Sequence, residues 1–297
     1  MNTQNKPILT VFTPTYNRIH TLPRVYESLL KQSNKDFIWL IVDDGSSDNT
    51  DELVKEWQKN DNGFEIQYVY KKNGGMHSAH NTAYDNIKTE LNTCIDSDDA
   101  IGEEAVEKII SFWKEHGSDK YAGIIGLDAD MDNKVIGKGF PEGLKVTTTT
   151  DYYANGGSGD KKMVYRTDVI NKYPRYPEFE GEKFVPLGLL YVMCDQDYEL
   201  LVLDEILVNV EYQEDGSTKN MYSQYKRNPK GFRHARLYAM KHPQSLKRLF
   251  VVCMHYVSCS LFIKDWKFLK NSPKKLMTFL AIPFGIALNL FIRYKTK

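Results

Sequence analysis

The first hundred residues repeat one pattern four times: an apolar or β-branched run, a polar loop and then a helical pattern. The run at residues 38–42, Ile-Trp-Leu-Ile-Val, is apolar at every position, as in a strand that is covered on both faces. Strands that alternate with helices form a parallel sheet with right-handed crossovers. We therefore expect an α/β fold with a mostly parallel sheet flanked by helices. The expected strands cover residues 8–13, 38–42, 64–70 and 92–95, and the expected helices cover residues 22–32, 48–58, 77–88 and the stretch that Glu103 and Glu104 open.

Each expected strand ends in a cluster of polar residues. The carboxyl ends of parallel strands lie at one edge of the sheet, where ligands bind in open α/β folds. We therefore expect the clusters to form the walls of a single crevice, although the second and third are also typical of ordinary turns and loops. The clusters are Thr15–Arg18, Asp43-Asp44, Asn73–Gly75 and Asp96–Asp99.

Three carboxylates, those of Asp96, Asp98 and Asp99, crowd into four positions after the fourth strand. Carboxylates this close disfavour joint ionisation unless a cation lies between them. Hard oxygen ligands suit Mg²⁺ or Mn²⁺, which take further ligands from water and substrate phosphates. The cluster therefore predicts a divalent metal site. The alternative is a solvated acidic loop in which Asp99 caps the following helix.

The other clusters carry groups that suit a nucleotide. Gly74 and Gly75 let the backbone approach a flat ligand closely. A carboxylate at Asp43 or Asp44 can accept hydrogen bonds from ribose hydroxyls or from a base N–H. A nucleoside diphosphate bridged by a metal would fill such a crevice.

Three motifs lie in order along this half of the chain: Phe-Thr-Pro-Thr-Tyr-Asn-Arg at residues 12–18, Ile-Val-Asp-Asp-Gly-Ser-Ser-Asp at residues 41–48 and Ile-Asp-Ser-Asp-Asp at residues 95–99. In this order and spacing they closely resemble the family 2 glycosyltransferases of the GT-A fold. The resemblance implies that Asp43 and Asp44 hold the uracil and ribose of a nucleotide sugar. It also implies that Asp96 and Asp98 are the ends of an Asp-x-Asp motif, with Asp98 the firmer metal ligand.

The same resemblance implies a set of nucleotide-binding residues and one departure. Many family members carry Ala-Arg-Asn after the glycine loop, whereas this chain has His80 between Ala79 and Asn81. A positive contact to the phosphate or base is therefore expected to be weaker or pH-dependent, although His77 and His80 are more simply interpreted as polar residues at a helix start. The expected nucleotide-binding residues are Thr13, Pro14, Thr15, Tyr16, Asn17, Arg18, Asp43, Asp44, Asn73, Gly74, Gly75, Asn81, Asp96 and Ser97.

The second half of the chain is expected to supply acceptor binding. A glycine-rich loop at residues 155–159 could close over a bound sugar. The loop at residues 213–219, which includes Lys219, resembles one that folds over the diphosphate, and an ordinary exposed turn is an equal alternative. The expected elements are strands at residues 163–167 and 206–212 and a helix at residues 187–200.

This half is also expected to supply a catalytic base. In the resembling family a carboxylate before the helix has this role, which implies Glu182 here, with Glu180 as its rival. Asp195 and Asp197 lie deeper in the expected helix, where acidic side chains are usually solvated.

Basic residues gather at the end of the chain. The formal net charge is zero, but residues 219–297 hold seventeen Lys and Arg and one acid, Asp265. Such a segment is expected to meet an anionic surface, either nucleic acid or phospholipid head groups. The chain opens without a signal-peptide pattern, and its four cysteines show no Cys-x-x-Cys spacing or disulfide framework. We therefore expect a reduced, cytoplasmic setting.

The apolar runs of this tail are too short or too interrupted to cross a bilayer cleanly. Pro283 and Gly285 are expected to break the last run, and Trp266 and Tyr294 are typical of a membrane interface. We expect peripheral attachment to the inner face of a membrane; packing on the catalytic domain, a dimer interface and a true span are the alternatives. Nucleic-acid binding is disfavoured because the apolar runs would then lack a partner. Helices are expected at residues 232–241, 246–263 and 276–292.

Residues 1–220 are thus predicted to form a GT-A glycosyltransferase domain, with a nucleotide-sugar half (1–100) and an acceptor half (101–220), before a helical tail (221–297). The predicted activity is an inverting, metal-dependent transfer of a hexosyl or N-acetylhexosaminyl group. The donor is a nucleotide sugar, UDP-linked by the resemblance, and the acceptor is a glycan or polyprenyl-linked glycan in cell-envelope polysaccharide synthesis. The alternatives are a sugar nucleotidyltransferase, which would more naturally carry a Gly-rich basic loop after the first strand, and a catalytically silent membrane scaffold.

Overall fold

A computed structural model describes residues 6–212, 220–242 and 245–297 of the chain. It forms two compact units. The first comprises Met1–Asn73, Ala79–Arg175 and Leu190–Tyr212, and the second comprises Gly74–Ser78, Tyr176–Leu189 and Gln213–Lys297.

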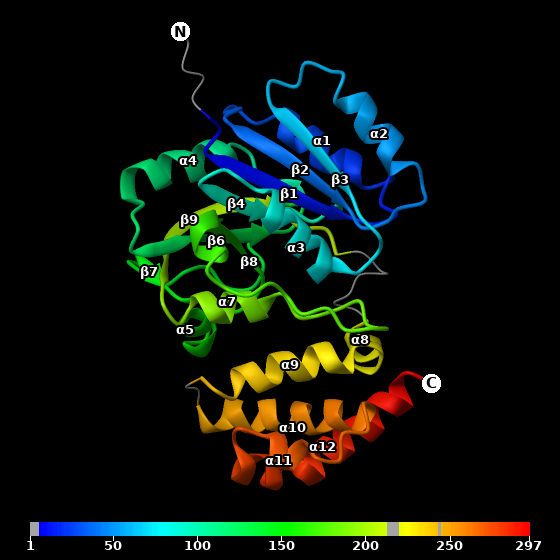
Figure 1. The fold of residues 1–297 in the computed structure, drawn as a ribbon. Coiled ribbons are helices and arrows are strands. Elements are labelled where there is room, and N and C mark those ends of the chain that lie inside the picture. Colours follow the sequence, from blue (N-terminus) through cyan, green and yellow to red (C-terminus); the bar gives the residue numbers. More distant parts are fainter. Residues whose placement is uncertain (1–5, 213–219, 243–244) are drawn as a thin grey trace. The chain divides into compact units, whose positions relative to one another are not determined.

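The first unit is built on a mixed sheet, which has nine strands in the described residues (Figure 1). The strand order is β3-β2-β1-β4-β8-β6-β9-β5, and β7 pairs with β9. Strands β1 to β4 run parallel, which confirms the fold predicted from the alternating pattern, whereas β8 is antiparallel to both β4 and β6. The strands are β1 (Leu9–Thr15), β2 (Phe37–Asp43), β3 (Glu65–Tyr70), β4 (Leu91–Cys94), β5 (Ala100–Ile101), β6 (Tyr121–Ala129), β7 (Val146–Thr147), β8 (Lys161–Arg166) and β9 (Glu199–Asn209).

Helices cover both faces of the parallel strands. Apolar residues of α1, α2 and α4 share one core with Val11 of β1 and Trp39 of β2, where the Trp39 ring stacks on Tyr26 and Trp57. Residues of α3 pack on the opposite face, which Figure 1 shows in front, where Phe12 meets Tyr84 edge to face. The helices that begin in the sheet half of the chain are α1 (Leu22–Leu30), α2 (Thr50–Trp57), α3 (Met76–Asn86), α4 (Ala105–His116), α5 (Thr149–Ala154), α6 (Thr167–Ile170) and α7 (Gly188–Cys194).

The predicted helix at residues 187–200 is wrong in its second half. Helix α7 ends at Cys194, and Glu199 already begins β9, which runs parallel to β6. Pairing with β6 buries the Leu-rich start of β9, so tertiary contacts outweigh its helical propensity. The strand predicted at residues 206–212 overlaps the end of this one long strand, which stops at Asn209.

The second unit holds five helices that lie wholly within its described residues. Helix α10 lies between α9 and α12 (Figure 1) and forms a small core with them around Tyr256 and Ala281. The predicted break at Pro283 and Gly285 is wrong, because α12 runs through both. Gly285 lies so close to α10 that an added Cβ would be 2.5 Å from the Cβ of Val257, and this packing holds the helix together. The helices are α8 (Met221–Arg227), α9 (Pro229–Ala239), α10 (Leu246–Phe262), α11 (Phe268–Asn271) and α12 (Lys275–Lys295).

Candidate active site

The ends of the four parallel strands are in register. Thr15 pairs with Asp43, and Asp43 pairs with Tyr70 across the neighbouring strand. Phe12 pairs with Cys94, so the acidic turn begins just beyond the end of β4. The polar residues that follow these strands within the first unit therefore lie along one edge of the sheet.

Asp43 organises the turn that follows β2. It is buried, its Oδ1 accepts a hydrogen bond from the backbone N–H of Ser46 at 2.7 Å, and its Oδ2 accepts one from the Tyr68 hydroxyl at 2.6 Å. Burial, reinforced by this bond to Asp43, raises the pKa of Tyr68. A carboxylate can accept about four hydrogen bonds, and these two bonds use about half of that capacity at Asp43.

The loops after β1 and β2 are joined to each other. The backbone N–H of Asn17 donates to Ser46 Oγ at 2.9 Å, and Asn17 Oδ1 accepts from the backbone N–H of Ser47 at 2.8 Å. Asp48 Oδ2 accepts from the backbone N–H of Ile19 at 3.0 Å. Asn17 has φ +53°, a left-handed conformation that asparagine tolerates better than most residues. The two loops therefore form one rigid wall.

Asp44 is buried beside a lysine that the sequence motifs did not include. Its Oδ1 lies 2.7 Å from Lys71 Nζ, and its backbone N–H donates to the Thr15 carbonyl at 2.8 Å. Asp44 holds the Lys71 ammonium group next to the strand ends. This ammonium group could donate hydrogen bonds both to Asp44 and to an anionic ligand.

The predicted nucleotide-binding residues differ in exposure. Thr13 is fully buried, and its Oγ1 accepts a hydrogen bond from the Trp39 indole N–H at 3.0 Å, so its side chain belongs to the core. Tyr16, in contrast, is 49% exposed. His80 is buried, with Nδ1 3.3 Å from the Tyr84 hydroxyl and Nε2 3.7 Å from Cys94 Sγ. His80 therefore lies in the first half of α3, as a buried residue that packs against Tyr84 and Phe12.

The three carboxylates of the acidic turn are partly or fully buried. Asp96 and Asp98 are half-buried and Asp99 is buried. Burial and the neighbouring Asp96 raise the pKa of Asp98, against the opposing effect of Arg18 and Arg24. Burial and Asp96 also raise the pKa of Asp99 to about 8. A bound cation would relieve this crowding.

The turn fits a divalent metal that is completed by a ligand. The residues that the structure describes contain no group of three or more His, Cys, Asp or Glu side chains arranged to hold an ion. Mg²⁺ and Mn²⁺ are commonly held by one or two carboxylates together with water and substrate phosphates. Asp96 and Asp98 are the two carboxylates expected to take this role. The donor set therefore suits an ion that enters together with a phosphate-bearing ligand.

Arg24 ties the acidic turn to the end of β9. Its Nη1 donates to the backbone carbonyl of Asp98 at 2.5 Å and lies 2.5 Å from Glu211 Oε2. The backbone N–H of Glu211 donates to Asp99 Oδ1 at 3.1 Å. These bonds fix the backbone of the turn and make Arg24 a positioning residue.

Sequence reasoning missed two charged residues beneath the turn. Lys162 on β8 donates to the Cys94 carbonyl at 2.9 Å, and although burial disfavours its cation, Asp128, Cys94 and Asp96 hold its pKa above the usual value. Asp128 on β6 is buried, and its Oδ1 has no hydrogen-bond partner among the described residues. The available signal for Asp128 was an acid inside a strand-like apolar run, whereas Lys162 stands before the apolar part of its strand and gave no signal.

Asp128 makes stability depend on pH. Burial raises its pKa from 3.8 to about 6, so the folded protein binds its proton more tightly than the unfolded chain does. Stability therefore falls as pH rises from about 4 to about 6, by up to about 3 kcal/mol. We expect Asp128→Asn to raise the melting temperature at about pH 8 and to leave it unchanged at about pH 4. Equal shifts at both pH values, measured by calorimetry, would contradict this origin.

Glu182, the predicted base, caps a helix in the second unit. Its two carboxylate oxygens accept the backbone N–H groups of Lys230 and Gly231, each at 2.9 Å, in the first turn of α9. Negative charge is favourable at that position. Glu180 is exposed, and its backbone carbonyl accepts a bond from Lys230 Nζ at 3.2 Å. The assignment of the base to Glu182 stays a prediction.

Asp195 and Asp197 lie beyond α7, which ends at Cys194; Asp197 is exposed and Asp195 is half-buried. Asp195 accepts hydrogen bonds from the backbone N–H groups and hydroxyls of Thr149 and Thr150, at the start of α5. Asp197 accepts one from the Tyr173 hydroxyl at 2.7 Å. Both therefore serve local structure.

The predicted glycine loops are constrained. Gly75 has φ +92°, and an added Cβ would lie 1.9 Å from the Lys183 carbonyl, so only glycine fits there. Both residues belong to the second unit, as does Gly74. The loop at residues 213–219, with Lys219, lies outside the described residues.

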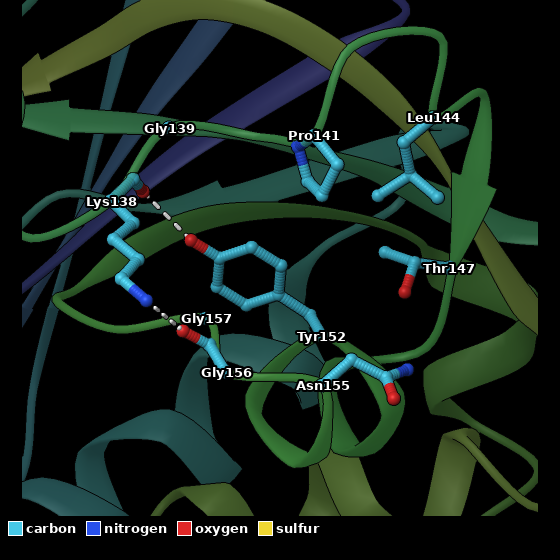
Figure 2. A pocket seen from close by; sticks show the side chains of 9 residues that line it. All are labelled: Lys138, Gly139, Pro141, Leu144, Thr147, Tyr152, Asn155, Gly156 and Gly157. Carbon is cyan, nitrogen blue, oxygen red and sulfur yellow. Dashed lines mark hydrogen bonds between the residues drawn. The ribbon is translucent and has the colours of Figure 1, made fainter.

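A separate cavity of about 250 Å³ opens beside the loop at residues 155–159 (Figure 2). The Tyr152 ring is part of its lining, and the Tyr152 hydroxyl donates to the Lys138 carbonyl at 2.7 Å. Lys138 Nζ in turn donates to the Gly156 carbonyl at 2.9 Å. The lining is Lys138, Gly139, Pro141, Leu144, Thr147, Tyr152, Asn155, Gly156 and Gly157.

Solved structures share the fold. S. aureus TarS (residues 1–349, in complex with UDP-GlcNAc) superposes with a TM-score of 0.61 at 20% identity, covering 94% of this chain and 81% of that one. The mannosyltransferase PcManGT of Pyrobaculum calidifontis, in complex with GDP-Man and Mn²⁺, gives 0.57 at 12% identity, covering 96% and 74%. The chain thus has the GT-A-type fold.

Sequence comparison adds the family. Residues 10–170, more than half of the chain, match the model of glycosyl transferase family 2. The chain belongs to this family and is a glycosyltransferase.

Curated relatives match to different extents. The chain is 24% identical over 230 residues to the GalNAc(5)-diNAcBac-PP-undecaprenol beta-1,3-glucosyltransferase of Campylobacter jejuni, covering 74% of this chain and 71% of that protein. A stretch of 115 residues is 32% identical to the glycosyltransferase GlyA of Streptococcus pneumoniae. That match spans 39% of this chain but only 16% of GlyA.

Proposed function

We propose that the enzyme transfers a hexosyl or N-acetylhexosaminyl group from a UDP-sugar to a lipid-linked glycan, with inversion at the anomeric carbon. The observation that carries this proposal is the alignment of buried acids and paired loops along one sheet edge, from Asp43 at the end of β2 to the acidic turn after β4. TarS binds UDP-GlcNAc and PcManGT binds GDP-Man, which supports a nucleotide-sugar donor.

The nucleoside is proposed to lie against the loops after β1 and β2. Asp43 and Asp44 would accept hydrogen bonds from the uracil and ribose, because carboxylates are acceptors when ionised. The bonds that join Asn17 to Ser46 and Ser47 hold this wall in place before the ligand arrives. Preformed contacts of this kind reduce the entropy lost on binding.

Asp98 and Asp96 are the residues proposed to hold Mn²⁺ or Mg²⁺. A bound divalent ion supplies Lewis acidity that offsets the charge developing on the departing nucleoside diphosphate. Arg24 keeps the turn in shape through the Asp98 carbonyl. Glu182 is proposed to accept the proton of the acceptor hydroxyl while that oxygen bonds to the anomeric carbon.

The acceptor is proposed to be a polyprenyl-linked glycan of the cell envelope. The Campylobacter jejuni relative is named for an undecaprenol-diphosphate-linked acceptor. To reach such an acceptor, the enzyme must act at a membrane surface. The basic tail is proposed to hold the enzyme at the inner face of that membrane. Residues 1–220 are proposed as the catalytic domain, with nucleotide-sugar and acceptor halves, and residues 221–297 as the attachment segment.

A panel of nucleotide sugars tests the proposal. The full chain is incubated with Mn²⁺ and each UDP- or GDP-sugar, and its melting temperature and released products are measured. A UDP-sugar at 100 times its Kd should stabilise the fold by about 2.7 kcal/mol, and UDP should be released. Release of pyrophosphate would point to a nucleotidyltransferase, and absence of any shift would contradict a nucleotide-sugar enzyme.

A further inference from the structure

Helix α12 exposes a continuous apolar face. Its large side chains are 42–75% exposed, and they recur every three or four residues from Leu276 to Tyr294. At about 100° per residue, the face covers roughly 160° of the helix circumference. A soluble monomer rarely leaves so long an apolar patch uncovered. The face consists of Leu276, Phe279, Leu280, Pro283, Phe284, Ile286, Ala287, Leu290, Phe291 and Tyr294.

The opposite face of α12 is fixed to α10 by small and polar residues. Asn289 Nδ2 donates to the Ser258 carbonyl at 3.0 Å, and the Thr278 hydroxyl contacts Cys253 Sγ at 3.6 Å. Gly285 lets the two helices approach closely at Val257. Helix α12 therefore presents its apolar face while it remains part of a folded bundle.

Basic residues border the apolar face. On the helix, Lys275 and Arg293 lie along one edge of it and Lys295 along the other. The single acid of the basic tail, Asp265, already pairs with Arg233 at 2.5 Å. Positive charge around an apolar stripe complements a surface of anionic phospholipids.

We propose that this face of α12 lies in the interface of an anionic membrane, with the helix axis along the surface and not across it. By length and composition the 21 residues could cross a bilayer, so length does not decide the orientation. The packing decides it. A spanning α12 would carry α10 into the bilayer or lose its bonds to α10, and α10 packs on α9, which holds Arg233 and Arg236.

Vesicle binding tests the surface independently of sugar transfer. The full chain is floated with vesicles of phosphatidylcholine alone or with added phosphatidylglycerol. We expect phosphatidylglycerol to raise the bound fraction about tenfold and the double variant Leu280→Glu, Phe284→Glu to abolish the gain. Met131→Glu, at an exposed apolar residue of the first unit, is the matched control and should bind like the wild type.

Depth measurements separate lying from spanning. Trp266 is the only exposed residue among the four tryptophans of the chain. The Trp266→Phe background therefore keeps only buried tryptophans, whose fluorescence should respond little to quenchers in the lipid. A single tryptophan is then introduced on α12, as Leu276→Trp, Phe284→Trp or Tyr294→Trp. Its fluorescence is measured in vesicles whose lipids are brominated near the head group or near the chain end. Equal, shallow quenching at all three positions supports the proposal. Deep quenching at Phe284→Trp alone would show a span and overturn it. A dimer in solution that fails to bind vesicles would overturn it equally.

Discussion

Asp98→Asn is expected to lower sugar transfer by a factor of about 10² to 10³, because the variant loses a proposed ligand of the metal ion that would offset the charge developing on the leaving group. Folding raises the pKa of Asp98, through burial and the charge of Asp96, so its ionised form costs stability near neutral pH. The asparagine variant should therefore be at least as stable as the wild type without metal. Its stabilisation by Mn²⁺ with UDP should be lost.

Asp132→Asn is the matched control for this variant, because Asp132 is an exposed acid in the loop after β6. It should retain wild-type transfer and the wild-type response to Mn²⁺ with UDP. Calorimetry and a UDP-release assay give the two readouts. Full activity of Asp98→Asn would remove Asp98 from the proposed metal site.

The parallel half of the sheet could be predicted because its signal is local. The apolar run that ends at Asp43 marks a strand covered on both faces, and the alternation of strands and helices predicts that it runs parallel to its neighbours, as it does. The acidic turn was visible for the same reason, since three carboxylates in four residues require an explanation.

Contacts between distant segments could not be predicted in this way. Lys162 is ordinary in the sequence and becomes important only because β8 runs antiparallel to β4 and brings its ammonium group to the Cys94 carbonyl. The start of β9 shows the opposite problem, because its leucines suit a helix until β6 pairs with them. In α12, packing of Gly285 on α10 outweighs the effect of Pro283.

Glu182→Gln is expected to lower kcat by a factor of about 10² to 10⁴, as general-base variants do, with a smaller effect on folding. Its carboxylate has a second role, because both oxygens accept backbone N–H groups at the start of α9. A glutamine keeps one carbonyl acceptor there, so the loss of stability should be about 1 kcal/mol. The two roles therefore predict different readouts, kcat for the base and melting temperature for the cap.

Glu180→Gln is the matched control, because it removes the same charge two residues away at an exposed carboxylate that caps no helix in the described structure. It should leave kcat and the melting temperature unchanged. Both variants are measured at saturating donor and acceptor, so that a change in binding does not pass for a change in the proton transfer. If Glu182→Gln lowers only the melting temperature, Glu182 is a structural residue. If Glu180→Gln lowers kcat instead, the base is Glu180.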